Sequence, residues 1–249
     1  MPNVCKVWVE SSRPKGELEK LVTGAGFKLD EREPEIVITY GGDGSILHAE
    51  AKYPGIPKLP IRENIIRAKC ETYAIDQIPK MLAKLSEGRY KTYEQGKVEA
   101  RLVGHQPQAE GEANSKGNAG RCRQRLIGLN EVQIHTRLPT HAIRFSFEMD
   151  GKKVDEIIGD GLIASTPHGS TAYFRSAGGK PFGKGIRIAF NNVWPRRKPV
   201  ELKGGVAVVK ILRDNAWLAA DNNSEIISLK PGDAVEIRQC ESKAIFVKI

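Results

Sequence analysis

Strand and helix patterns alternate along the first part of this chain, and this alternation limits its fold more than any other feature. The strand patterns are short runs rich in β-branched residues, and the clearest helix pattern has apolar residues spaced three or four apart. The strands are expected at Val4–Val9 and Glu35–Tyr40, and the helices at Lys15–Ala25, Ser45–Lys52 and Asp76–Glu87. This order is typical of an α/β domain.

From about Tyr93 the pattern changes to short strand-like runs separated by Gly, Pro and Asn. The runs are Lys97–Val103, Arg125–His135, Ile143–Met149, Leu162–Ser165, Val206–Leu212 and Lys243–Ile249. Between the first two lies His105–Gln124, which has almost no large apolar side chain and cannot offset its ordering entropy by burial. The sequence therefore predicts a mainly β second part with a long mobile hairpin loop.

Charge and cysteine usage narrow the class of protein. The 249 residues include 39 Lys and Arg against 30 Asp and Glu, a formal net charge of +9 that favours anionic partners such as nucleotides or polyphosphate. The charges are dispersed rather than gathered with aromatic residues, which argues against a nucleic-acid surface.

The four cysteines, Cys5, Cys70, Cys122 and Cys240, form no C-x-x-C pair, which argues against a zinc site or a disulfide framework. Without a leader-like start or a run of about 18 apolar residues, we expect a cytoplasmic protein with no membrane partner.

The first candidate site is the segment Ile36–His48, in which a buried-strand pattern runs into Gly-Gly-Asp-Gly and then into a helix pattern opened by Ser45. Glycines let the backbone approach a ligand closely, and the N–H groups at a helix start favour phosphate. A carboxylate beside phosphate is electrostatically costly, so Asp43 would need a role there, such as accepting a proton or holding a metal. The alternative is a tight turn of the kind that Asp-Gly pairs favour, with no ligand.

Two further segments place polar residues at the ends of apolar strands. In Gly159–Tyr173 the strand runs into small hydroxylated residues, a glycine and Tyr173, a loop that could hydrogen-bond a nucleoside and pack on a ring. In Leu129–His135 the polar pair Asn130 and Glu131 interrupts a strand pattern. An ordinary Ser/Thr-rich connection and a hydrogen-bonded strand terminus are the alternatives for these two segments.

In this order the three segments resemble the NAD kinase family. The shared motifs are Gly-Gly-Asp-Gly at Gly41–Gly44, Asn-Glu at Asn130 and Glu131, and Asp-Gly-Leu-Ile-x-Ser-Thr-Pro-x-Gly-Ser-Thr-Ala-Tyr at Asp160–Tyr173. The last motif, followed by Ser176-Ala-Gly-Gly179, is the most specific, because Gly-Gly-Asp-Gly also occurs in diacylglycerol and sphingosine kinases and in 6-phosphofructokinases. The resemblance implies an enzyme that phosphorylates the 2′-hydroxyl of NAD.

The resemblance also implies a fold and an assembly. A Rossmann-like α/β amino-terminal domain, residues 1–95 with 239–249, would carry Gly-Gly-Asp-Gly. A mainly β carboxy-terminal domain, residues 96–238, would bind NAD, and the final strand would return to the first domain. We expect a homo-oligomer, a dimer or tetramer, that uses ATP or polyphosphate as phosphoryl donor, with Mg²⁺ or another divalent cation held mainly by the substrate phosphates.

Residue roles carry over from the family motifs. Asp43 would be the catalytic base, while Gly41, Gly42, Gly44 and Ser45 would bind the ATP phosphates. Arg175 could contact the new 2′-phosphate. The expected NAD-binding residues are Asn130, Glu131, Asp160, Thr166, His168, Thr171, Ala172, Tyr173 and Asp221.

The chain departs from the family pattern in three places. The stretch Ile56–Ile65 stands where the family has Asn-x-Gly-x-Leu-Gly-Phe-Leu, Asp221-Asn222 stands for a common Asp-Gly, and His168 stands where Thr or Ser is usual. The first departure leaves room for a dinucleotide-binding sensor without turnover. The shared Gly-Gly-Asp-Gly leaves room for a lipid or small-alcohol kinase, although the Thr166–Tyr173 loop argues against it. The choices between ATP and polyphosphate and between NAD and NADH stay open.

Overall fold

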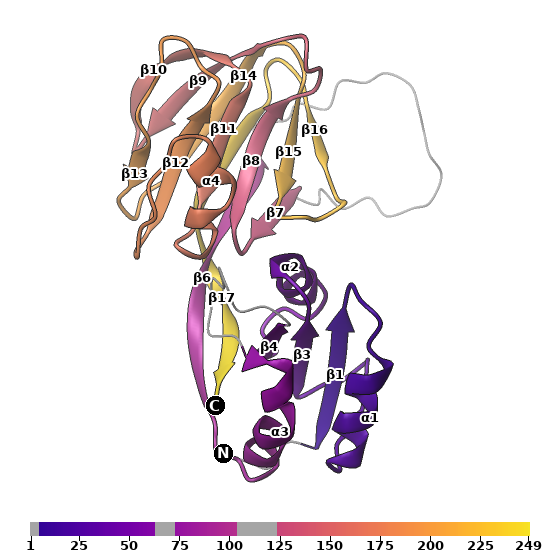
Figure 1. Ribbon diagram of the computed structural model, residues 1–249. Helices are drawn as coiled ribbons and strands as arrows, with labels where there is room; N and C mark the ends of the chain where they lie inside the picture. Colours follow the sequence, from indigo (N-terminus) through magenta and orange to yellow (C-terminus); the bar gives the residue numbers. More distant parts are fainter. Residues whose placement is uncertain (1–4, 63–72, 104–123) are drawn as a thin grey trace. The chain divides into compact units, whose positions relative to one another are not determined.

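The computed structural model describes residues 5–62, 73–103 and 124–249 (Figure 1). The chain divides into two compact units. Unit 1 consists of Met1–Lys97, Asp221–Asn223 and Glu241–Ile249, and unit 2 of Val98–Ala220 and Ser224–Cys240. The expected loop His105–Gln124, except for Gln124, and two of the cysteines, Cys70 and Cys122, lie outside the described residues.

Unit 1 is built on a parallel sheet. Its strands are β1 (Lys6–Ser11), β2 (Lys28–Leu29), β3 (Ile36–Tyr40), β4 (Lys58–Arg62) and β5 (Tyr73–Ala74), and the order β4-β3-β1-β2 continues on the other side of β4 with β5. The helices are α1 (Gly16–Gly24), α2 (Asp43–Lys52) and α3 (Ile78–Ser86), the last preceded by a 3-10 turn at Ile75–Gln77. The predicted α/β character of this part of the chain is confirmed.

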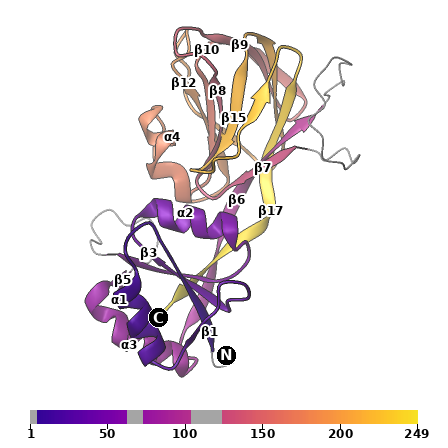
Figure 2. The same cartoon turned by 90° about the vertical axis from the view of Figure 1, so that its right-hand side faces the viewer.

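Alternation along β3 assigns the helices of unit 1 to opposite faces of the sheet. Ile36 and Ile38 belong to the core that also contains the buried side chains of α1 and α3, whereas Val37 packs with Ala49 and Tyr53 from the α2 side. Successive residues of a strand point to opposite faces, so α2 covers one face and α1 with α3 covers the other (Figure 2). Every residue of β3 is buried, as expected for a central strand covered on both faces.

Unit 2 is a sandwich of two mainly antiparallel sheets. One has the order β13-β12-β11-β8-β15-β16, and the other contains β10, β9, β14 and the first part of β17, together with the pair β6 and β7. Inward side chains of both sheets form one apolar core that includes Ile134, Phe145, Leu162 and Val209. The bounds are β6 (Lys91–Val103), β7 (Arg125–Gly128), β8 (Glu131–Thr136), β9 (Ile143–Met149), β10 (Lys152–Gly159), β11 (Gly161–Ser165), β12 (Ile186–Asn191), β13 (Val200–Leu202), β14 (Ala207–Arg213), β15 (Ala216–Ala220), β16 (Ile227–Leu229) and β17 (Ala234–Lys248). The prediction of a mainly β carboxy-terminal part is confirmed.

The last strand returns to unit 1. Residues 234–237 of β17 pair antiparallel with β14, and Phe246 pairs with Lys58 of β4 in parallel register. Residues Glu241–Ile249 accordingly belong to unit 1. The expected return of the final strand is therefore confirmed.

Several boundaries differ from the sequence-based expectation. The run Arg125–His135 is two strands, because Leu129 and Asn130 form a bend between β7 and β8. β4 was not predicted, since prolines interrupt the stretch that precedes and includes it. Pro57 and Ile61 of this segment accept backbone hydrogen bonds from β3 and its turn, so Pro60 faces the other edge. On that edge β17 pairs with β4 at Lys58, and β5 pairs with β4 from Ile61 onward. Pro60 lies between these two pairings, so its missing N–H costs no hydrogen bond to either strand.

Candidate active site

The Gly-Gly-Asp-Gly turn joins the end of β3 to the start of α2 in unit 1. Gly41 has a φ of 136°, a conformation that favours glycine, and its N–H donates to the carbonyl oxygen of Ile61 at 3.1 Å. A Cβ atom at Gly41 would lie 2.7 Å from Ser45 Oγ, closer than real Cβ contacts. The turn therefore requires glycine at position 41 both for backbone conformation and for space.

α2 begins at Asp43, two residues before the predicted start at Ser45, with Gly42 as its N-cap. A Cβ atom at Gly42 would meet no heavy atom of the described residues within 4 Å. The backbone N–H groups of a first helical turn lack intrahelical partners, and the helix dipole is positive at this end. An anion can therefore approach the helix start at Gly42, and Asp43 lies in the first turn beside it.

Asp43 forms an ion pair with Arg62, the last residue of β4. Arg62 Nη2 donates to Asp43 Oδ1, and the side chains are 10% and 28% exposed, respectively. The pairing follows from the sheet, because Tyr40 at the end of β3 is opposite Ile61 in the parallel register with β4. Arg62 belongs to the Ile56–Ile65 stretch and was not among the predicted site residues.

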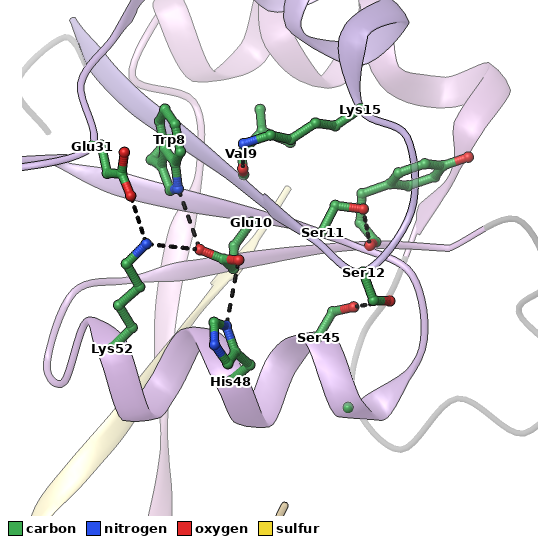
Figure 3. A network of polar contacts seen from close by, with 12 residues as sticks. Trp8, Val9, Glu10, Ser11, Ser12, Lys15, Glu31, Ser45, His48 and Lys52 are labelled. Carbon is green, nitrogen blue, oxygen red and sulfur yellow. Dashed lines mark hydrogen bonds and ion pairs between the residues drawn. The ribbon is translucent and has the colours of Figure 1, made fainter. Parts of the chain in front are cut away.

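Further polar contacts hold α2 on the sheet (Figure 3). Ser45 Oγ and Ser12 Oγ, which follows β1, are 3.1 Å apart. Farther along the helix, Glu10 of β1 contacts His48 Nδ1 at 3.4 Å and Lys52 Nζ at 3.5 Å. These contacts fix the helix that carries Asp43.

Asp221 lies in a turn whose residues Asp221–Asn223 belong to unit 1. Asp221 has a positive φ of 48°, and Asn222 Nδ2 donates to the carbonyl oxygen of Gly44 at 3.2 Å. The structure thus brings the residue after Asp221 to the same turn as Gly41–Gly44.

In unit 2 the Ser/Thr loop folds back onto Asn130. Thr166 N–H donates to the Asn130 carbonyl oxygen at 2.9 Å, and Thr166 Oγ1 donates to the Leu129 carbonyl oxygen at 2.6 Å. Gly169 N–H donates to Thr166 Oγ1 at 3.1 Å, and a Cβ atom at Gly169 would lie 2.1 Å from the Asn130 carbonyl oxygen. The predicted segments Leu129–His135 and Gly159–Tyr173 are therefore joined by hydrogen bonds, and glycine is required at position 169 for their close approach.

Asp160 and Tyr173 both accept hydrogen bonds from the end of β12, the strand that follows the loop and α4. Asn192 Nδ2 donates to Asp160 Oδ2 at 3.0 Å, and Asn191 Nδ2 donates to the Tyr173 hydroxyl at 3.1 Å. Burial raises the pKa of Tyr173, and the negative charges of Asp160 and Glu131 raise it further, although the hydrogen bond from Asn191 opposes this. Tyr173 is therefore a neutral hydroxyl, able to donate or accept a hydrogen bond, near two carboxylates.

The remaining expected site residues lie on the loop and the short helix after it. His168–Thr171 form a 3-10 turn, His168 is buried, and Thr171 is exposed. Helix α4 (Tyr173–Ser176) carries Arg175 with its side chain exposed. The glycine of Ser176-Ala-Gly-Gly179 at position 179 packs against Phe174, since a Cβ atom there would lie 2.1 Å from Phe174 Cε1.

The predicted site residues form two groups. Gly41, Gly42, Asp43, Gly44, Ser45 and Asp221 lie in unit 1, whereas Asn130, Glu131, Asp160, Thr166, His168, Thr171, Ala172, Tyr173 and Arg175 lie in unit 2. Arg62, Asn191 and Asn192, which contact predicted site residues, were not predicted from the sequence. The polar pair after the apolar run Ile186–Phe190 was the available signal for the two asparagines, while Arg62 had no local signal.

No group of three or more His, Cys, Asp or Glu side chains in the described ranges could hold a metal ion. No helix in the same ranges is long and apolar enough to cross a membrane.

Comparison with known proteins identifies the family. Residues 129–249 match the ATP-NAD kinase C-terminal domain. An NAD kinase of Thermoplasma volcanium is 30% identical over 238 residues, covering 93% of this chain and 80% of that protein. A bifunctional NADP phosphatase/NAD kinase of Methanococcus maripaludis is 30% identical over 221 residues, covering 85% of this chain and 36% of that protein.

Two solved structures share the fold. Yeast NADH kinase complexed with NADH superposes with a TM-score of 0.80 at 16% identity, over 100% of this chain and 84% of that chain. An NAD kinase from Archaeoglobus fulgidus in complex with ATP superposes with a TM-score of 0.74 at 20% identity, over 97% and 92% of the two chains. With the sequence match to the Thermoplasma volcanium enzyme, these findings show that the chain belongs to the NAD kinase family.

Proposed function

We propose that this protein transfers the γ-phosphoryl group of ATP to the 2′-hydroxyl of the adenosine ribose of NAD, giving NADP. As a member of the NAD kinase family, the protein is a phosphotransferase that acts on NAD. The observation that supports the mechanism best is the position of Asp43, a carboxylate in the first turn of a helix that starts beside two glycines.

Asp43 is the proposed general base. An alcohol is a poor nucleophile, and a positioned carboxylate can accept its proton as the new bond to phosphorus forms. The 2′-oxygen bonds to the γ-phosphorus, the bond from that phosphorus to the β–γ bridging oxygen breaks, and the proton passes to Asp43. ADP leaves with the bridging oxygen.

The turn around Asp43, with Gly41, Gly42 and Gly44, is the proposed phosphate site. Gly42 leaves room for phosphate beside the backbone, Gly41 and Gly44 allow the tight turn, and the helix start favours negative charge. The Ser45 hydroxyl, 3.1 Å from that of Ser12, can reorient to donate to a phosphate oxygen.

The loop of unit 2 supports binding of the acceptor. Tyr173, with its raised pKa, remains a neutral hydroxyl. The hydroxyl of Thr166 is engaged within the loop, so we assign Thr166 to shaping the site rather than to direct contact. Arg175, exposed on α4, suits the new 2′-phosphate, since a guanidinium matches phosphate geometry. The other proposed NAD-binding residues are Asn130, Glu131, Asp160, His168, Thr171, Ala172 and Asp221.

This chemistry can use a divalent cation that is not held by a dedicated set of protein ligands. Asp43 is a single carboxylate already paired with Arg62, a donor set that suits Mg²⁺ held mainly by substrate phosphates. The bound ion would neutralise phosphate charge during transfer. The protein's own share is then to position the nucleotide and to accept the proton. We also expect ATP rather than polyphosphate as donor, a homo-oligomeric enzyme and a cytoplasmic location.

The test is product formation by the purified protein. Wild type with MgATP and NAD should produce NADP, measured by chromatography, and the same assay with polyphosphate and with NADH defines donor and acceptor. Asp43→Asn should lower kcat by about two to four orders of magnitude, the usual contribution of a general base. Asp76→Asn, an exposed carboxylate of unit 1, is the matched control and should keep wild-type turnover. No NADP above a no-enzyme blank with any donor would refute the proposed activity.

A further inference from the structure

Arg62 lies beside the Gly-Gly-Asp-Gly turn because of strand register. Arg62 is the last residue of β4. The residue before it, Ile61, lies opposite Tyr40 of β3, and the Ile61 carbonyl oxygen accepts a hydrogen bond from the Gly41 N–H. The carboxyl ends of parallel strands meet at the same edge of a sheet, which is where ligands bind in open α/β sheets. The strand register therefore places Arg62 at the edge of the sheet where ligands bind in such folds.

The environment of Arg62 is unusual for an arginine. The residue is 8% exposed, and it keeps its charge because a guanidinium does not lose a proton in proteins. One Nη donates to Asp43, while Nε, which is fully buried, has no hydrogen-bond acceptor among the described residues. A buried charged donor without a partner is costly, and it predicts an acceptor that arrives with a ligand.

Other basic side chains around α2 are already engaged. Lys58 and Lys97 both donate to Glu50, and Lys52 pairs with Glu10 and Glu31 (Figure 3). The proposed reaction brings a triphosphate next to the Asp43 carboxylate, so two negative groups must share this edge. Arg62 carries the positive charge that offsets their repulsion.

We propose that Arg62 serves two partners in turn: it holds the Asp43 carboxylate before substrate binds, and it then donates hydrogen bonds to oxygen atoms of the transferred phosphoryl group. The proposal rests on the proposed function and deepens it by naming a second charged residue of the phosphate site. Arg62 has the geometry for this exchange, because its planar fork of N–H donors matches the oxygen atoms of both carboxylate and phosphate groups.

ATP affinity tests the proposal without requiring turnover. Arg62→Met should weaken ATP binding, measured by titration calorimetry, by about tenfold to a hundredfold, the value of a charge-assisted hydrogen bond. Arg62→Lys should fall between wild type and Arg62→Met, because it retains the charge but loses the fork. Arg32→Met, an exposed arginine of unit 1, is the control and should bind ATP as wild type does.

Asp43→Asn provides the second arm, which leaves Arg62 in place. Removing the carboxylate frees Arg62 for phosphate and also removes a charge that repels the triphosphate, so ATP should bind several-fold more tightly than to wild type. The part of this gain that depends on Arg62 should be lost in the double variant with Arg62→Met, where the gain should be clearly smaller. In steady-state assays Arg62→Met should raise KM for ATP while KM for NAD stays unchanged.

The outcomes separate the two proposals. If wild type makes NADP but Arg62→Met binds ATP as tightly as wild type, or the Asp43→Asn gain is as large in the double variant as in the single one, the role of Arg62 is refuted and the kinase function stands. If Arg62→Met raises KM for both substrates together and lowers the melting temperature, Arg62 is structural only and the proposal fails. If wild type makes no NADP with any donor, the proposed function fails, whereas the ATP titrations still decide the role of Arg62.

Discussion

A buried charge cluster in unit 1 gives a sharp test of how the helix carrying Asp43 is held. Glu50 of α2 accepts from Lys97 Nζ at 2.8 Å through one carboxylate oxygen and from Lys58 Nζ through the other. Lys58 also donates to the Tyr53 carbonyl oxygen at 2.7 Å. The side chains of Lys58, Lys97 and Glu50 are 0%, 4% and 5% exposed. The cluster therefore carries two positive charges and one negative charge.

This imbalance predicts losses of very different size for two neutralising variants. Glu50→Gln leaves two buried ammonium groups without their carboxylate. At 2.8 Å the pair of Lys97 and Glu50 attracts by roughly 6 kcal/mol at an effective dielectric constant of about 20, and desolvation offsets part of that. We expect Glu50→Gln to lower the opening free energy of this region by about 3–5 kcal/mol. Lys58→Met leaves the balanced pair Glu50 and Lys97, so its loss should stay within about 1 kcal/mol, the value of the hydrogen bond to Tyr53.

The assay is amide hydrogen exchange of peptides from α2 and β4, which reports local opening free energies. Peptides from β9 and β14 in unit 2 serve as the internal control and should exchange as in wild type. The reasoning is refuted if Lys58→Met and Glu50→Gln lower protection equally, or if Glu50→Gln leaves α2 unchanged.

Three further predictions concern packing and charge. Gly169→Ala should push the loop away from Asn130, because its Cβ would lie 2.1 Å from the Asn130 carbonyl oxygen, and should weaken NAD binding by at least about tenfold in calorimetry; unchanged affinity would contradict the close approach. Thr166→Val removes both a donor and an acceptor in a fully buried position and should lower stability to urea by about 1–3 kcal/mol, whereas a neutral change would contradict the two hydrogen bonds. Burial lowers the pKa of Lys58 below the ordinary 10.5, so the unfolded chain binds more protons there and stability rises with pH in this range. Wild type should accordingly gain stability relative to Lys58→Met as the pH rises towards 10.5, and a constant difference in urea midpoint would contradict this.

Local chemistry made the glycine turn and the α/β pattern predictable. A continuous apolar run placed β3, and the glycines marked its end, because a φ of 136° at Gly41 favours one residue type. The helix start was misplaced by two residues, since a glycine N-cap gives no side-chain signal. The contact between Asn130 and the Ser/Thr loop was not visible locally, because the antiparallel pairing of β8 with β11 creates it.

Features that depend on neighbouring strands escaped prediction. β4 was not predicted because proline is rarely found in a central strand. Pro60 is accommodated because the edge of β4 away from β3 pairs with β17 before Pro60 and with β5 after it. Arg62 was missed for the same reason, since its place beside Asp43 follows from the register of that strand. Asn191 and Asn192 resembled an ordinary strand end until their contacts with Tyr173 and Asp160 were known.

The central claim is that Asp43 performs chemistry while the loop around Asn130 and Tyr173 holds the acceptor. Calorimetric NAD affinity and kcat, measured together on Asp43→Asn and Asn130→Ala, test it most directly. We predict that Asp43→Asn keeps the NAD dissociation constant within about twofold of wild type while kcat falls by about two to four orders of magnitude, and that Asn130→Ala loses NAD affinity. Retained turnover in Asp43→Asn, or unchanged NAD affinity in Asn130→Ala, would contradict the account.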